Sequence, residues 1–435
     1  MSSLFAEIKF GTSARVISNY RAAGIRVIRE YENLSGFLGF EEMWRFDAPG
    51  GTLLQPLVTG DIIYLEPEEE HSYAQKLWRE QQPFGTSYMQ LGQAVSSGVR
   101  TSLPQILKMV DAPDAHRAGL TGQGVVCLVV DSGVDASVVP DAQKAGGWTD
   151  DPDGDPWRDS FGHGTMVTRM LLAAAPGCSI FSVKVQEGPN GGLLKESVLA
   201  AVNDLVPVVR SNPGIQLVMN NSWGTGGCTE EDYWCGMLPA RLIRSMSTND
   251  IASIVMAAGN TNTECSLKLG QRDVPMVLCI NSSPGAMTVG ALDRSGRPQY
   301  YSSRGPGQCS PFVPWVSAPT FGILPWGTAW METGDQGAGT SSTTPLVSGC
   351  LAVLKGAFPK ASNVELFAAI AASALRTVGH ERDLGRPWDP ATGFGMLQIM
   401  GAVEALREID RFPAEQRVAA EHQFVRVRPV ISPMV

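Results

Sequence analysis

The 435-residue sequence lacks any apolar run that is long and uncharged enough to cross a lipid bilayer. Its first residues also lack the basic segment and apolar run of a secretory signal, so we expect synthesis in the cytoplasm and any export by a non-classical route. Basic residues are fewer than acidic ones, 34 against 43, which gives a net charge of -9. This negative charge repels phosphate and argues against nucleic acid or a membrane surface as a partner.

Cysteine is scarce as well, because eight residues are scattered along the chain and no CxxC pair is present. Such spacing excludes the disulfide framework of a small domain and gives no zinc signature. Cys127 and Cys350 stand in apolar runs, which predicts buried thiols. Cys228 and Cys235 flank a short loop that a disulfide could close under oxidising conditions, although we expect free thiols there.

The composition that remains is that of a folded protein with many turns, with 43% hydrophobic residues, 47 glycines and 29 prolines. The length predicts one large domain and a smaller one. From Phe5 to Glu68, strand-like and helix-like runs follow a β-α-β-β-α-β order, with SGFLGFEE as the third strand, which is typical of a ferredoxin-like α+β domain. We therefore divide the chain into an N-terminal domain (1–73), a polar linker (74–100), a main domain (101–408) and a C-terminal extension (409–435).

The main domain contains continuous apolar strands separated by helix-length segments. The strands are VVCLVVD, IFSVKV, IQLVMNNS, SIVMAAGN and AMTVGAL. Their pattern predicts an α/β fold, a doubly wound and mostly parallel sheet with helices on both faces. In that architecture ligands bind at the carboxyl ends of strands, and Asp131, Ser222 and Asn260 stand at three of those ends.

Four residues in the main domain form a candidate catalytic set. Serine is a weak nucleophile unless a base removes its proton, and an imidazole base needs a buried carboxylate to orient it. Asp131 ends an apolar strand, His163 lies between two glycines at a helix start, and Ser341 heads a second helix. Asn260, in AAGN, could donate its amide to an oxyanion. Each residue alone would more often be a turn, cap or structural residue, but four at strand and helix ends indicate catalysis.

These motifs resemble those of the subtilisin-like serine proteases, from about Pro104 to Ala405. The aspartate motif is VVDSGVD, the histidine motif GHGT, the oxyanion motif AAGN, and the serine motif GTSxxxPxxxG at residues 339–349. The resemblance implies the family's fold and an endopeptidase with an Asp131, His163 and Ser341 triad and Asn260 in the oxyanion hole. It further implies two substrate-binding segments. The first pairs with the substrate backbone and consists of Ser222, Trp223 and Gly224. The second forms the facing wall of the S1 pocket and consists of Ala257, Ala258 and Gly259.

The sequence departs from the family pattern beside two of these motifs. Met166, Thr168 and Arg169 replace the usual His-Ala-Gly continuation of the histidine motif, and 342–344 read Ser-Thr-Thr where Met-Ala-Ser is usual. These changes concern packing and subfamily, since none of the replaced residues takes part in the chemistry. Ser342 is an alternative nucleophile, but the family position fits Ser341.

The N-terminal domain resembles the inhibitory propeptides of this family, although an unrelated accessory domain is the alternative reading. The resemblance implies a self-inhibited zymogen that cuts itself at Tyr73–Ala74 or between Gln82 and Arg100, with its own N-terminal domain as inhibitor. The chemistry requires no cofactor. Many relatives bind structural calcium, and residues 150–159 are oxygen-rich, but they do not fit an EF-hand. Acidic residues at 230–232 could favour basic substrates, although a solvated loop is the simpler reading.

Three other functions remain to be weighed against a polypeptide-cleaving enzyme. A sedolisin-type acid peptidase uses glutamate in place of histidine, and GHGT counts against it. A catalytically silent module that binds extended peptides by strand addition would not need all four chemical residues. A dinucleotide-binding oxidoreductase is suggested by Gly122 and Gly124, but those glycines precede the strand and do not open the following helix.

Overall fold

The computed structural model describes most of the chain after residue 100. The described ranges are 101–149, 151–185, 194–212, 214–224, 235, 238–260, 277, 279–320, 339–377 and 388–410, together with the backbone of four strands between residues 2 and 67. The predicted linker (74–100), its cleavage bonds, Cys228, the acidic residues 230–232 and nearly all of the C-terminal extension lie outside these residues. None of the described helices is long and apolar enough to cross a membrane.

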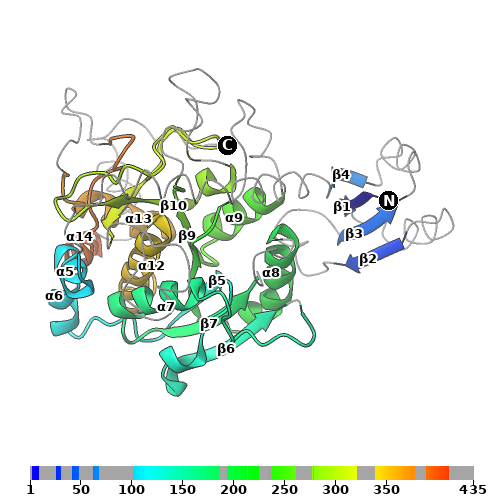
Figure 1. Cartoon of the computed structure of the whole chain (residues 1–435), viewed down its shortest axis with the longest axis horizontal. Helices are drawn as coiled ribbons and strands as arrows, with labels where there is room; N and C mark the ends of the chain where they lie inside the picture. The colour runs from blue at the N-terminus through cyan, green and yellow to red at the C-terminus, as the bar shows by residue number, and fades with distance from the viewer. Residues whose placement is uncertain are drawn as a thin grey trace.

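A seven-stranded sheet with only parallel pairs forms the centre of the main domain (Figure 1). The strand order is β11-β10-β9-β8-β5-β7-β6. The chain starts at β5 inside the sheet, forms the edge strand β6 and then β7 on one side, and afterwards runs outward on the other side from β8 to β11. The strands are β5 (Val125–Asp131), β6 (Lys144–Thr149), β7 (Ser179–Lys184), β8 (Gln216–Asn221), β9 (Ser253–Ala257), β10 (Ala286–Leu292) and β11 (Val316–Pro319). The predicted doubly wound α/β fold is confirmed.

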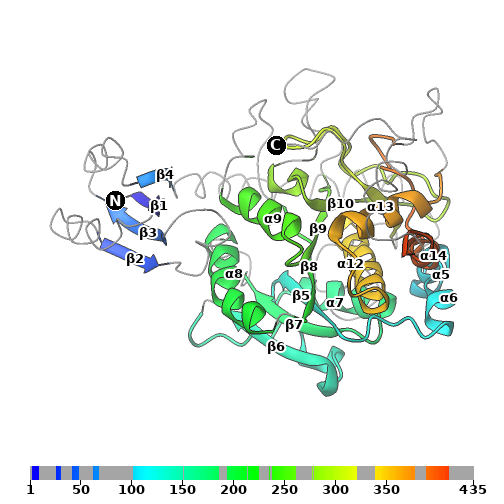
Figure 2. The ribbon, with the colours of Figure 1, turned by 180° about the vertical axis from the view of Figure 1, so that it is seen from behind.

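Helices cover both faces of this sheet, as the two opposite views show (Figures 1 and 2). One face packs on α5 (Leu103–Met109), α6 (Ala112–Arg117), α7 (His163–Ala174), α12 (Thr340–Ala357), α13 (Asn363–Ser373) and α14 (Ile399–Asp410). The other packs on α8 (Leu194–Ser211) and α9 (Leu238–Thr248). Strand β5 shows why both faces are apolar, because Cys127 and Val129 face the first core while Leu128 and Val130 face the second.

The four N-terminal strands form a separate antiparallel sheet in the order β2-β3-β1-β4. They are β1 (Ser2–Ile8), β2 (Arg26–Glu30), β3 (Glu42–Ala48) and β4 (Ile62–Pro67). The third strand is EMWRFDA, so its assignment to SGFLGFEE is wrong: all seven residues of β3 pair with β1. The helices expected between these strands lie outside the described residues, and the propeptide-like role of this unit stays a prediction.

The cysteines follow the sequence-based expectation only in part. Cys127 and Cys350 are buried free thiols, as predicted, and Cys178 is a third. Cys235 forms a disulfide with Cys309, 74 residues away, with the two Cα atoms 5.2 Å apart. The expected free thiol at Cys235 and its pairing with Cys228 are therefore both wrong, because the fold brings a distant cysteine within bonding distance.

Candidate active site

The predicted catalytic residues gather at one edge of the sheet. Asp131 ends β5, and Asn260 follows β9 by three residues. His163 is the first residue of α7, and Ser341 is the second residue of α12. Parallel strands direct their carboxyl ends to the same edge, so residues far apart in the sequence meet there.

Asp131 and His163 are in direct contact. The Nδ1 atom of His163 lies 2.7 Å from Oδ1 of Asp131, and the same carboxylate oxygen accepts the amide of Ser132 at 2.8 Å. Asp131 is nearly buried, whereas 22% of the His163 side chain is exposed. The second oxygen, Oδ2, is buried without a hydrogen-bond partner among the described residues. A buried carboxylate bound to Nδ1 fixes the orientation of the imidazole ring.

A second carboxylate, Asp159, joins the start of α7 to the end of β5. Its Oδ1 atom accepts Ser132 Oγ at 2.9 Å and the amides of Phe161 and Gly162 at 3.2 and 2.7 Å. Its Oδ2 atom accepts both the amide and the hydroxyl of Thr165, at 2.8 and 2.6 Å. Gly162 has no side chain to cap α7, so Asp159 satisfies the Thr165 amide in the first turn and the amides of the two residues just before the helix. Sequence reasoning missed this role and took Asp159 only as part of an acidic loop.

The same two carboxylates determine the pKa of His163. Burial of the imidazole by itself lowers its pKa. The charge and hydrogen bond of Asp131, with a further contribution from the charge of Asp159, raise it by more. The net result is a His163 pKa above its ordinary value, so the imidazolium form is stabilised.

Ser341 and Ser342 have different environments. The hydroxyl of Ser341 is half-buried and donates to the carbonyl of Ser222 at 2.8 Å. Ser342 is fully buried, and its Oγ is 2.8 Å from the hydroxyl of Thr320 and 3.0 Å from the carbonyl of Gly339. Only Ser341 of the two presents its hydroxyl at the edge of the sheet where the candidate residues meet.

Asn260 is held by the first residue of α12. Its Oδ1 atom accepts the amide of Thr340 at 2.9 Å and the hydroxyl of Thr340 at 3.1 Å. With the amide oxygen used in this way, the Nδ2 group remains as a donor close to Gly339, two residues before Ser341. Gly339 makes this approach possible, because a Cβ atom there would lie 3.0 Å from Nδ2 of Asn260, and its φ of 85° is unfavourable for other residues.

Tyr301 stabilises the turn at Gly339, and the sequence analysis did not identify it. Its buried hydroxyl accepts the amide of Gly339 at 3.0 Å. Burial raises the pKa of Tyr301, so this phenol stays protonated and available as a hydrogen-bonding group. The turn that presents Thr340 and Ser341 is therefore held through its backbone and through Asn260.

The two predicted substrate-binding segments continue from neighbouring strands. Ser222, Trp223 and Gly224 follow β8, and Ala257, Ala258 and Gly259 span the end of β9. The amide of Gly259 donates to Thr340 Oγ1 at 3.1 Å, which joins the second segment to the same threonine that holds Asn260.

The described carboxylates of the acidic loop before His163 accept hydrogen bonds from the protein itself. Both oxygens of Asp159 are occupied by protein donors, and the carboxylates of Asp151 and Asp155 accept the loop amides of Asp153 and Trp157. Among the residues that the structure describes, no group of three or more acidic, histidine or cysteine side chains could hold a metal ion. The loop is built as a set of capped turns.

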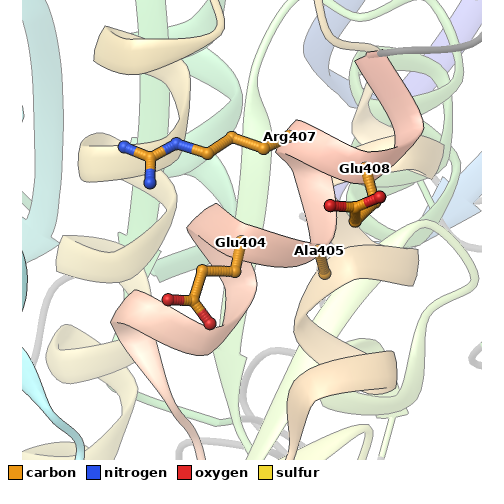
Figure 3. Close-up of a pocket in the computed structure, with 4 residues that line it drawn as sticks. All are labelled: Glu404, Ala405, Arg407 and Glu408. Atoms are coloured by element: carbon orange, nitrogen blue, oxygen red, sulfur yellow. The ribbon is translucent and has the colours of Figure 1, made fainter.

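A pocket of about 440 Å³ is lined by residues of a single helix (Figure 3). Its lining residues, Glu404, Ala405, Arg407 and Glu408, all belong to α14. They include none of the predicted catalytic residues, so this pocket is not the candidate active site.

Comparisons with known proteins identify a family for this chain. The model of the subtilase family matches residues 122–401. The chain is 27% identical over 276 residues to subtilisin E of Bacillus subtilis (strain 168), which covers 61% of this chain and 64% of that protein. It is 28% identical over 265 residues to an alkaline protease of Alkalihalobacillus alcalophilus, which covers 61% and 63%. The match thus spans less than two thirds of these relatives' own lengths.

Solved structures show the same fold. A lanthipeptide protease superposes with a TM-score of 0.50 at 21% identity, over 71% of this chain and all of its own. A serine protease of Aeromonas sobria superposes with a TM-score of 0.51 at 22% identity, over 69% and 63%. The family model covers well over half of the sequence and includes all four candidate residues, and the chain therefore belongs to the subtilase family.

Proposed function

We propose that this chain is a serine endopeptidase in which Ser341 is the nucleophile, His163 the general base, Asp131 its orienting partner and Asn260 a donor to the oxyanion. The observation that carries this proposal is the 2.7 Å contact between Asp131 and Nδ1 of His163, at the sheet edge that Ser341 shares. This contact orients the ring of His163, whose Nε2 is the proton acceptor in the proposed reaction.

The reaction proceeds through an acyl-enzyme. The hydroxyl of Ser341 first turns from the Ser222 carbonyl toward Nε2 of His163, since it donates to that carbonyl in the free protein. Its oxygen then bonds to the substrate carbonyl carbon while its proton moves to Nε2. The peptide C–N bond breaks as His163 returns this proton to the leaving amine, and water cleaves the ester by the same steps.

Negative charge on the substrate oxygen is stabilised by groups that are already in place. Asn260 keeps Oδ1 on Thr340, so Nδ2 donates without reorganisation when the charge develops. The amide of Ser341 lies in the first turn of α12, where the helix dipole favours negative charge. The chemistry needs no cofactor, and a structural calcium ion elsewhere in the chain stays an expectation.

We further propose that the enzyme is made in the cytoplasm as a zymogen that residues 1–73 inhibit, and that a non-classical route exports it if it leaves the cell. Its substrate is polypeptide, bound between Ser222–Gly224 and Ala257–Gly259, and neither nucleic acid nor a membrane is a partner. An acid peptidase is disfavoured by His163, whose raised pKa would leave it protonated in strong acid.

The test is a fluorophosphonate probe with intact-mass analysis and casein digestion, applied to wild type, Ser341→Ala and Ser342→Ala. We expect wild type and Ser342→Ala to be labelled and active, and Ser341→Ala to be neither labelled nor active. N-terminal sequencing of the same samples tests the zymogen, because only chains with Ser341 should be cut between residues 73 and 100. A folded wild type that binds peptides but takes no label would instead support the silent binding module.

A further inference from the structure

The two predicted substrate-binding segments begin where a pair of strands separates. Strands β8 and β9 are parallel neighbours, and their last paired residues are Asn221 and Met256. Beyond this pair the segments 222–224 and 257–259 continue without ladder hydrogen bonds between them. Any space for a substrate side chain between the two segments is therefore controlled by whatever holds them at this fork.

Asn281 closes the fork. Its Nδ2 atom donates to the carbonyl of Trp223 and to the carbonyl of Ala257, both at 2.7 Å. One planar amide therefore bridges the two segments and holds these carbonyl oxygens within about 5 Å of each other. Asn281 is only 3% exposed, so loss of its donor would remove a partner from the buried carbonyl of Ala257 and from the partly buried carbonyl of Trp223.

The position of Asn281 is itself fixed by its surroundings. It belongs to the 3-10 helix η6 (Cys279–Ser282), and its own carbonyl accepts the hydroxyl of Thr288, in β10, at 2.6 Å. The next residue, Ser282, accepts the amide of Cys309 at 2.9 Å, and Cys309 carries the disulfide to Cys235. The bridge is thus attached to the sheet on one side and to a cross-linked loop on the other.

The backbone of the first segment lies directly on this amide. A Cβ atom at Gly224 would come within 2.8 Å of Oδ1 and 3.0 Å of Nδ2 of Asn281. Gly224 has no such atom, so the segment and the amide are in close contact. A larger side chain at either position must therefore displace the segment 222–224.

We propose that Asn281 is a specificity-determining residue. The segments 222–224 and 257–259 form the two walls of the pocket for P1, the substrate side chain before the cleaved bond, and Asn281 fixes the width of this pocket by bridging them. This inference rests on the proposed peptidase function. Removing the bridge frees the walls and leaves the space of one amide between them, so bulky P1 side chains gain relative to small ones. One methylene group in such a pocket changes selectivity about 10- to 200-fold.

The experiment compares peptide substrates that differ only in P1, namely alanine, leucine and phenylalanine. For Asn281→Ala we expect the phenylalanine-to-alanine ratio of kcat/KM to rise about tenfold or more, while the rate of fluorophosphonate labelling changes less than about threefold. Equal losses for all three substrates would show a structural role only and overturn the proposal. An unchanged ratio would overturn it too.

Asn363 provides a matched control. It is 2% exposed, and its Nδ2 atom also bridges two carbonyls, those of Ser247 and Ala252, at 2.9 and 3.0 Å. This bridge joins the end of α9 to the start of β9, away from the two walls. Asn363→Ala should destabilise the protein without changing the P1 ratio, and an equal shift in both variants would overturn the assignment to Asn281.

A second variant keeps the test valid if Asn281→Ala does not fold. In Gly224→Ala the new Cβ atom presses on the Asn281 amide, so we expect a shift of the P1 ratio toward alanine. When Gly224→Ala is combined with Asn281→Ala, this close contact is removed, and the shift of the P1 ratio toward alanine should become smaller. A Gly224→Ala enzyme with the wild-type P1 ratio contradicts the proposal. Wild type that neither cleaves peptides nor takes the probe contradicts the proposed function itself, which distinguishes the two failures.

Discussion

Asp159→Asn changes one charge and almost no volume, and it tests how α7 is joined to β5. The carboxylate accepts five hydrogen bonds, three at Oδ1 and two at Oδ2. Asparagine offers one oxygen, so its NH₂ group must face either the amides of Phe161 and Gly162 or the amide of Thr165. At least one amide is left unpaired at about 1–3 kcal/mol, and the remaining bonds lose their charge assistance. We expect the free energy of unfolding to fall by about 2–4 kcal/mol.

The same substitution should change the pH dependence of catalysis. The negative charge of Asp159 is one of the causes that raise the pKa of His163, together with the charge and hydrogen bond of Asp131. Only the neutral imidazole can accept the proton of Ser341, so activity rises with pH through the pKa of His163. In wild type the acid limb of kcat/KM should therefore lie above the ordinary histidine value of 6.5, and in Asp159→Asn it should move to lower pH.

The assay is the pH profile of kcat/KM, measured beside urea unfolding of the same samples. Asp153→Asn is the matched control, because it removes the same charge from an exposed position in the same loop. We expect its acid limb and stability to stay at wild-type values. If Asp159→Asn keeps both the wild-type profile and the wild-type stability, the carboxylate neither caps α7 nor acts on His163, and the reasoning is refuted.

Two further predictions concern the turn before Ser341. Asn260→Ala should lower kcat about 10²–10³-fold with KM nearly unchanged, which is the known loss when subtilisin itself is deprived of its oxyanion asparagine; an unchanged kcat would remove Asn260 from the oxyanion site. Tyr301→Phe leaves the amide of Gly339 without its acceptor and should cost about 1–3 kcal/mol of unfolding free energy together with a lower kcat. Wild-type stability in Tyr301→Phe would mean that the phenol does not hold this turn.

The parts of the fold that could be predicted are those whose pattern is local. Strands β5, β8, β9 and β10 are continuous apolar runs because both of their faces are covered, and their sequences predict them directly. The edge strand β6 was missed, because KAGGWT contains two glycines and its residues alternate between partly buried and exposed over its first four positions. Likewise β3 is determined by its pairing with β1, and the local pattern of EMWRFDA does not predict this pairing.

The functional residues also divide into those with a local sequence signal and those without one. Asp131, His163, Asn260 and Ser341 stand in short motifs, and the sequence therefore predicts them before any distance is known. Thr340 and Asp159 carry a weaker local signal, since each lies within four residues of a predicted catalytic residue and has a side chain suited to capping. A carboxylate shortly before a glycine that opens a helix could have been read as that helix's cap.

Asn281 carries no such local signal, and the reason is physical. Its two acceptors are 58 and 24 residues away in the sequence, and they come together only because β8 and β9 are neighbours in the sheet. The Cys235–Cys309 disulfide likewise joins two cysteines that are 74 residues apart in the sequence. Local motifs specify which atoms react, whereas the spacing of the walls that receive a substrate is determined by contacts between distant segments. Asn281, which we propose sets the choice of substrate side chain, therefore stands outside every family motif.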